Sequence, residues 1–185
     1  MPIIRTERLM LTPATEEQLM AELLSPGALS QALHVEVTGE WPPEFYDDDA
    51  VRYTLEHLRA NPDHSDWGFY YIVLPESAER AATVIGAAGF KGPPDANGEV
   101  ELGYGIIPSQ QRRGFATEAV RGMTKFAFED ARVRTVVGQT IPSLAGSIGV
   151  LEKAGFDFDG EGNVAHVPEG ESVIRYVLSR ERYDA

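Results

Sequence analysis

The segment Pro108-Ser-Gln-Gln-Arg-Arg-Gly-Phe-Ala-Thr-Glu118 is the most informative part of the sequence. It follows a β-type apolar run, residues 99–107, and precedes apolar residues at helical spacing, so it marks a strand-to-helix junction. The first amides of a helix have no partner within the helix, and the helix dipole makes that end partly positive. Gly114 lets the backbone approach an anion closely, and Arg112 and Arg113 add positive charge beside it. The segment therefore predicts a binding site for a pyrophosphate group.

The better-known phosphate-binding loops do not match the sequence. No glycine-rich loop ends in Gly-Lys-Ser or Gly-Lys-Thr, and Gly103-Tyr-Gly105 is followed by Ile-Ile-Pro rather than by a turn and a helix. Mononucleotide- and dinucleotide-binding folds are therefore disfavoured. Taken alone, residues 111–116 are equally typical of a polar loop before a helix, so the rest of the chain must decide between these two interpretations.

The elements on either side of this segment predict an α+β fold in a single domain over residues 1–185. Before it we expect a strand, helices and three antiparallel strands: strand 8–12, helix 15–25 ended by Pro26-Gly27, a short helix and loop over 29–43, helix 47–61, and strands 68–74, 83–90 and 99–107. After it we expect a helix from Gly114, strand 134–140, a helix from Pro142 to Gly155, and strands starting near residues 156 and 173. This order predicts a mixed, mostly antiparallel, twisted sheet of about six or seven strands flanked by helices.

The composition excludes several classes of function. A formal net charge of −13 opposes binding to nucleic acids or anionic membranes over an extended face. No signal peptide or membrane span is visible, so a cytoplasmic location is expected. Cysteine is absent, and the histidines have no paired ligand spacing, so no metal site is predicted; they are His34, His57, His64 and His166. Six of the 16 basic residues lie within 112–134, which favours a small anionic ligand, although Arg121, Lys125 and Arg132 are more typical of a solvated helix face.

Further motifs follow one another across nearly the whole chain: Arg5-Thr-Glu-Arg-Leu-Met-Leu11, Glu101-Leu-Gly-Tyr104, Gly114-Phe-Ala-Thr-Glu-Ala119 and Val150-Leu-Glu-Lys-Ala-Gly-Phe156. Residues 111–116 match the loop pattern of Gln or Arg, two variable residues, Gly, one variable residue, then Gly or Ala. Together these motifs resemble the GNAT superfamily of N-acetyltransferases. They are most similar to the branch that contains the ribosomal-protein N-terminal acetyltransferases.

The resemblance implies acetyl-CoA as co-substrate and a central strand that has a bulge and splays from its neighbour; Gly103 and Gly105 suit such irregularity. It implies that the end of this strand, Ile106 and Ile107, pairs with the pantetheine arm. It further implies that the loop and the first helical turn bind the pyrophosphate through Gln111, Arg112, Arg113, Gly114, Phe115, Ala116 and Thr117.

Acetyl transfer requires a neutral amine and a proton source for the leaving thiolate. By resemblance, Glu101 is the expected general base, with Glu99 as the nearest substitute; the alternative is an ordinary carboxylate on the sheet surface. Many relatives have a tyrosine acid where this chain has Leu151, and an asparagine where it has Leu144. Ser147 matches a serine of the ribosomal branch and is the second expected catalytic residue.

The acceptor is expected to be a primary amine, either a protein N-terminus or a small molecule, and the protein is expected to be a monomer or a homodimer. Four aromatic residues could line an acceptor pocket, although aromatic residues in such positions are more often core: Trp41, Tyr46, Trp67 and Tyr70. Residues 47–49 are more typical of a helix start than of an amine-binding site. Two other functions stay open, a non-catalytic CoA-binding module and RNA binding through the arginine-rich segment.

Overall fold

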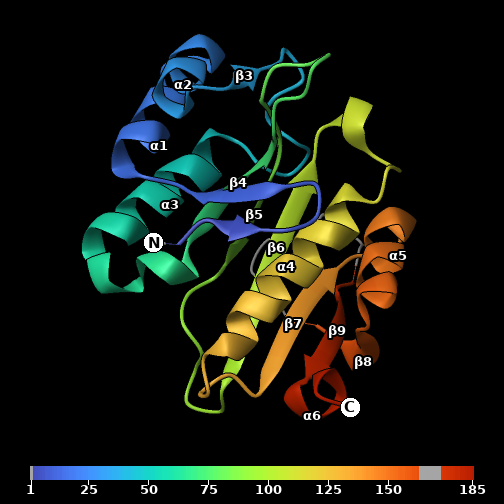
Figure 1. Ribbon diagram of the computed structural model, residues 1–185. Helices are drawn as coiled ribbons and strands as arrows, with labels where there is room; N and C mark the ends of the chain where they lie inside the picture. The colour runs from blue at the N-terminus through green and yellow to red at the C-terminus, as the bar shows by residue number, and fades with distance from the viewer. Residues whose placement is uncertain (1, 163–171) are drawn as a thin grey trace.

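The computed structural model describes residues 2–162 and 172–185, and within these residues nine strands form one sheet (Figure 1). The strand order is β1-β2-β4-β5-β6-β7-β9-β8, and β3 pairs with β5. The strands are β1 (Ile4–Arg5), β2 (Met10–Pro13), β3 (Glu36–Val37), β4 (Phe69–Leu74), β5 (Thr83–Phe90), β6 (Glu99–Ile106), β7 (Thr135–Thr140), β8 (Asp157–Glu161) and β9 (Ile174–Ser179). Among these described strands, only β3–β5 and β6–β7 are parallel pairs, so the sheet is mixed and mostly antiparallel, as predicted.

Helices cover both faces of this sheet. The α-helices are α1 (Glu16–Glu22), α2 (Pro26–Leu33), α3 (Asp48–Ala60), α4 (Phe115–Glu129), α5 (Ala145–Ala154) and α6 (Arg180–Tyr183), and two 3₁₀ turns are η1 (Pro62–Trp67) and η2 (Pro108–Gln110). Figure 1 shows α4 crossing the sheet with α5 at its side, whereas α1, α2 and α3 gather away from α5. Within the described ranges, no helix is both long and apolar enough to span a bilayer.

Local sequence signals explain most of the helix boundaries. Thr15 and Gln18 form the predicted capping box at the start of α1. Asp47 caps α3 by accepting a hydrogen bond from the Ala50 amide at 3.0 Å, and Gly155 ends α5 in the left-handed conformation with φ of 100°. These caps confirm the sequence interpretation at α1, α3 and α5.

The segment between α1 and α3 differs from the prediction. The expected end of the first helix, Pro26-Gly27, is instead the start of α2, because Ser25 accepts a hydrogen bond from the Ala28 amide at 3.1 Å and Pro26 occupies the first helical position. A proline there needs no amide partner, so the same residue can end one helix or begin another. The two-residue strands β1 and β3 were also missed, since two residues carry no readable alternation.

The central strand β6 has no bulge, which corrects the expectation of an irregular strand at Gly103 and Gly105. Its register against β5 runs without interruption from Leu102–Phe90 to Ile106–Gly86. Of these two glycines, only Gly105 serves close packing. A Cβ at Gly105 would lie 3.1 Å from Pro43, whereas a Cβ at Gly103 would meet no atom within 4 Å.

Candidate functional site

The two parallel strands β6 and β7 pair over a short length and then separate. Their register runs from Glu99–Thr135 to Leu102–Gly138 and stops there, while β6 continues to Ile106 along β5. The fold therefore has a gap between β6 and β7 beyond Leu102. The sequence predicted such a splayed pair only through the resemblance.

The backbone of β6 presents polar groups to this gap. In an antiparallel pair, successive residues direct their N–H and C=O groups alternately to one neighbour and to the other. The Ile107 amide donates to the Ile85 carbonyl of β5 at 2.9 Å, so the odd-numbered residues face β5. The even-numbered residues beyond Leu102, Tyr104 and Ile106, therefore direct their backbone groups towards β7 and into the gap.

This open edge is one residue shorter than the sequence predicted. Ile107 already uses both backbone groups, because its carbonyl also accepts a hydrogen bond from the Gln110 amide at 3.0 Å. The Gln111 side chain donates to the Ile106 carbonyl at 2.9 Å and so links the loop to the strand end. The groups left for a ligand are the N–H of Ile106 and both backbone groups of Tyr104, a residue that the prediction missed.

The first turn of α4, which follows the end of β6 in the chain, has no side-chain cap. Gly114 is the N-cap, with φ of 83°, and no side chain forms a cap hydrogen bond. The first bond within the helix is donated by Glu118 to the Gly114 carbonyl at 3.0 Å. The amides of Phe115, Ala116 and Thr117 therefore stand at the helix end without an intrahelical acceptor, as predicted for an anion site.

The loop before α4 has a conformation that also suits an anion. Arg112 adopts φ of 60°, which is uncommon for a residue other than glycine, and Gly114 is left-handed as well. Left-handed residues in a short loop turn successive amides towards one concave face, which attracts anions. Arg112 and Arg113 are exposed beside it.

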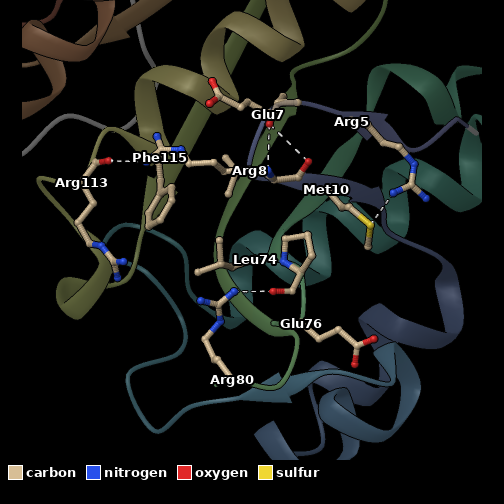
Figure 2. A pocket seen from close by; sticks show the side chains of 12 residues that line it. Arg5, Glu7, Arg8, Met10, Leu74, Glu76, Arg80, Arg113 and Phe115 are labelled. Carbon is tan, nitrogen blue, oxygen red and sulfur yellow. Dashed lines mark hydrogen bonds between the residues drawn. The ribbon is translucent and has the colours of Figure 1, made fainter. Parts of the chain in front are cut away.

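A cavity of about 540 Å³ lies beside the start of α4, between the β1–β2 turn and the β4–β5 turn (Figure 2). Arg8, Arg80 and Arg113 line it, together with Arg5 and two acidic residues, Glu7 and Glu76. The guanidinium groups of Arg8 and Arg113 lie 4.6 and 5.0 Å from the centroid of the Phe115 ring. Positive charge from distant parts of the chain therefore gathers near the open amides. The sequence could not bring Arg8 and Arg80 to this place.

Glu118 fixes the first turn of α4 to the N-terminal hairpin. Its carboxylate accepts hydrogen bonds from the Thr6 hydroxyl at 2.6 Å and from the Arg8 amide and Nε, both at 2.7 Å. Burial alone would raise the pKa of Glu118, but the hydrogen bonds from Thr6 and Arg8 outweigh it and lower the pKa. This contact joins the N-terminal motif to the motif at α4.

Glu101 pairs with Val137 of β7, one residue before the last β6–β7 pair, so it lies next to the gap. Lys91 forms an ion pair with one carboxylate oxygen, and Gln139 Nε2 donates to the other at 3.0 Å. Glu99, the substitute candidate, is held differently, because Arg175 binds both of its oxygens at 2.8 and 2.6 Å. Of the two carboxylates, Glu101 is the one beside the gap, and Glu99 belongs to a contact between β6 and β9.

Ser147 lies in the first turns of α5, on the other face of the sheet from Glu101. The Tyr104 hydroxyl is 3.0 Å from both the hydroxyl and the carbonyl oxygen of Ser147. Burial raises the pKa of Tyr104 to about 12, so its hydroxyl is protonated near neutral pH. Glu101 and Ser147 therefore flank the gap from opposite faces, and Tyr104 links Ser147 to β6.

The two positions that depart from the family pattern have structural roles. Leu151 is fully buried, and a Cβ at Gly138 would lie 2.5 Å from its side chain, so Leu151 packs directly on β7. Leu144 is the N-cap of α5 and forms no side-chain cap bond. Neither side chain carries a group that could transfer a proton.

A second, larger cavity of about 900 Å³ lies on the Glu101 face of the sheet. Among the four aromatic residues expected around an acceptor pocket, only Tyr46 lines it. Trp41, Trp67 and Tyr70 are buried in the hydrophobic core, at 8%, 8% and 0% exposure, which agrees with the core alternative. Asp47 both caps α3 and lines the cavity.

The part of the chain that the structure describes contains no group of three or more His, Asp or Glu side chains that could hold a metal ion. His57 and His64 line the larger cavity, and His34 ends α2. His166 lies outside the described residues.

Comparisons with known proteins agree with this geometry. Residues 8–157 match the family model described as the acetyltransferase (GNAT) domain. The uncharacterized N-acetyltransferase YjdG of Bacillus subtilis is 29% identical over 157 residues, which cover 84% of this chain and 90% of the relative.

Two solved structures share the fold over nearly the whole chain. An acetyltransferase from Agrobacterium tumefaciens has 26% identity and a TM-score of 0.61, covering 95% of this chain and 94% of its own. RimL, a ribosomal-protein acetyltransferase in complex with coenzyme A, has 15% identity and a TM-score of 0.68, covering 96% and 98%. The fold that the ribosomal branch implied is therefore confirmed. The family match extends over most of the sequence, so the protein belongs to the GNAT family of acetyltransferases, which confirms the predicted class, an acetyl-CoA-dependent N-acetyltransferase.

Proposed function

We propose that this protein transfers the acetyl group of acetyl-CoA to a primary amine, with Glu101 as general base. One observation carries the proposal: three features meet at the same end of the sheet. They are the uncapped start of α4 at Gly114, the edge of β6 that opens after Leu102, and the Glu101 carboxylate one residue before that edge.

The start of α4 binds the pyrophosphate of the donor. The amides of Phe115, Ala116 and Thr117 donate hydrogen bonds to it, and the positive end of the helix dipole adds attraction. The amides and side chains of Arg112 and Arg113 support them. The coenzyme A in the RimL structure is consistent with this role for the shared fold.

The open edge of β6 holds the arm that carries the thioester. Pantetheine contains two amide groups, and an extended chain with amides can pair with a free strand edge as an additional strand does. Tyr104 offers an N–H and a C=O, and Ile106 offers an N–H, all directed into the gap. The thioester then lies near the point where the strands part, next to Glu101.

Glu101 takes a proton from the attacking amine, because a protonated amine has no lone pair. The nitrogen forms a bond to the acetyl carbon, the bond from that carbon to sulfur breaks, and the sulfur leaves as a thiolate. The nitrogen then loses its second proton to solvent, which replaces the proton that the thiolate takes up, and Glu101 releases the first proton to solvent when the product leaves. Lys91 must yield its place at Glu101 to the amine. The Lys91 side chain is 52% exposed, and exposed ion pairs contribute little free energy, so this exchange costs little.

Ser147 supplies the proton that the leaving thiolate takes up. Its hydroxyl borders the gap and is hydrogen bonded to Tyr104, whose hydroxyl is protonated near neutral pH. Tyr104 therefore acts through Ser147: it fixes the orientation of the serine and can return the proton to it. Tyr104 is a positioning residue in this scheme, and Ser147 is the group that contacts the sulfur.

The acceptor is a primary amine on a protein N-terminus or on a small molecule. The name of RimL describes a protein acceptor, whereas the cavity of about 900 Å³ that Gly103 and Lys91 help to line has the size of small-molecule sites. The protein acts as a monomer or a homodimer, and it acts in the cytoplasm.

Incubation with acetyl-CoA and a panel of amines and peptides, with release of free thiol and the acetylated product both followed, tests the proposal. Turnover of at least one acceptor is expected. Binding of acetyl-CoA without turnover of any acceptor would instead support a CoA-binding module without catalysis.

A further inference from the structure

The larger cavity owes its space to a run of small residues in the sheet. Ala87 pairs with Gly105 and Gly89 pairs with Gly103, so the part of β5 and β6 below the cavity has almost no side chains on this face. At Gly103 the space is open, since a Cβ there would meet no atom within 4 Å. Gly103 is two residues from Glu101 and on the same face, so the floor of the cavity leads to the proposed base.

Aromatic side chains form the walls of this cavity. Tyr46 stacks on Phe69, with ring centroids 4.8 Å apart and planes 13° apart. The Tyr46 hydroxyl also donates to Glu22, a half-buried carboxylate that accepts further hydrogen bonds from Trp41 and Tyr71. The ring of Tyr46 is therefore held in place from behind.

The mouth of the cavity combines exposed aromatic rings with negative charge. Phe45 is 70% exposed and Tyr53 is 68% exposed, although both are large apolar side chains that a protein normally buries. Phe45 also has φ of 63°, an uncommon conformation for a phenylalanine. The residues that line the cavity include three acidic ones, Glu44, Asp47 and Asp49. These features attract a cation that has an apolar body.

We propose that the acceptor is a small-molecule primary amine with an aromatic ring or a similarly bulky apolar body. This inference rests on the proposed acetyl transfer and specifies its acceptor. The ring lies between the stacked pair of Tyr46 and Phe69 on one side and the exposed Phe45 on the other, and the amine extends over Gly103 to Glu101. The carboxylates at the mouth draw the protonated amine from solution, and Glu101 then receives its proton.

The shape of the site favours a small molecule over a peptide. The sheet closes the cavity from below, and α3 and residues 43–47 close it from the sides. A cavity of about 900 Å³ is within the range of sites that bury most of a drug-sized ligand. A peptide acceptor would need an extended groove along which several residues could pair, and it is tested as the competing outcome.

The test compares two small amines that differ in the apolar body alone, with a peptide as the competing acceptor. Initial rates are measured with 2-phenylethylamine, ethylamine and an unblocked decapeptide that begins with serine, each with saturating acetyl-CoA. Burial of the ring should raise kcat/KM for 2-phenylethylamine at least about tenfold above ethylamine. Equal values for the two amines, or a higher value for the peptide, would overturn the inference.

A pair of matched variants tests whether the aromatic ring of the acceptor binds in the cavity. Phe45→Ala should remove most of the advantage of 2-phenylethylamine over ethylamine. Phe158→Ala should leave it unchanged, because Phe158 is a comparably exposed phenylalanine, at 61%, on β8 and on the other face of the sheet. The same loss in both variants, or in neither, would show that the ring does not bind at Phe45.

Calorimetric titration of the whole protein with 2-phenylethylamine separates this inference from the proposed reaction. Binding that is weaker in Phe45→Ala than in Phe158→Ala supports the site even if no acceptor is turned over. Turnover of other amines without any heat from 2-phenylethylamine would leave the reaction in place and overturn the aromatic acceptor.

Discussion

The hydroxyl of Tyr104 lies 3.0 Å from the hydroxyl of Ser147, so a strand and a helix are joined where β6 has already separated from β7. Tyr104 contributes twice to this place, since its backbone faces the gap and its side chain reaches α5. The position of Ser147 therefore depends on β6, the strand that also carries Glu101.

Replacement of Ser147 by alanine should lower kcat about tenfold or more, because the thiolate loses its proton donor, and should leave KM for acetyl-CoA nearly unchanged. Tyr104→Phe should lower kcat less, since the serine remains. Steady-state kinetics with both substrates varied checks the two variants. Tyr183→Phe, at an exposed tyrosine near the C-terminus, is the control. An effect confined to KM would argue against proton donation by Ser147.

Replacement of Glu101 by glutamine should lower kcat by about 10² or more at neutral pH. The loss should shrink as the pH rises towards the pKa of the acceptor amine, because solvent then supplies the neutral amine. Glu99→Gln is the matched control and should keep most of the rate, since Glu99 binds Arg175 rather than facing the gap. The reverse ranking in a pH–rate profile of both variants would assign the base to Glu99.

Gly103→Ala should block the site without harming the fold. The added methyl group would meet no atom within 4 Å, and alanine is more favourable than glycine in a strand by about 0.5–1 kcal/mol, so the melting temperature should not fall. kcat/KM for the amine should nevertheless fall about tenfold, because the methyl group projects into the cavity next to Glu101. Gly39→Ala, in an open loop position, is the control. Unchanged kinetics would move the acceptor away from Gly103.

Glu118→Gln should lower the free energy of unfolding by about 1–2 kcal/mol at pH 7, because three hydrogen bonds to a carboxylate are weakened. The pKa of Glu118 is lowered in the folded protein from the ordinary 4.5, so its stabilisation is present above pH 4.5 and is lost as the pH falls through the folded value. The difference between wild type and variant should therefore shrink in acid. Urea unfolding at several pH values measures it, with the exposed Glu129→Gln as control. A difference that does not change with pH would contradict this role.

Patterns within single elements predicted much of the fold. The limits of β5 were predicted to the residue, and the helix after Gly114 was predicted from its apolar spacing, because alternation and helical period are local properties. The start of α2 was not predicted, since Pro26 suits both the end of one helix and the start of the next. β3 depends on pairing with β5, a contact between distant segments that no local pattern reveals.

In the candidate site, too, features set by consecutive residues could be predicted, whereas contacts between distant segments could not. The open helix end at Gly114 could be predicted, because an anion site there needs only consecutive residues. The partners of Glu101 could not, since Lys91 and Gln139 come from other strands. The cavity was missed as well. Its floor depends on the cross-strand register of Ala87, Gly89, Gly103 and Gly105, and only a known register brings these four small residues together.

The central claim is that the start of α4 and the open edge of β6 bind acetyl-CoA together. Titration of ¹⁵N-labelled protein with CoA, followed by amide chemical shifts, tests it most directly. The largest changes should occur at the amides of residues 112–117 and at Tyr104 and Ile106, with smaller changes on β8. Saturable changes that gather on another face of the sheet, or no changes at any CoA concentration, would contradict the claim.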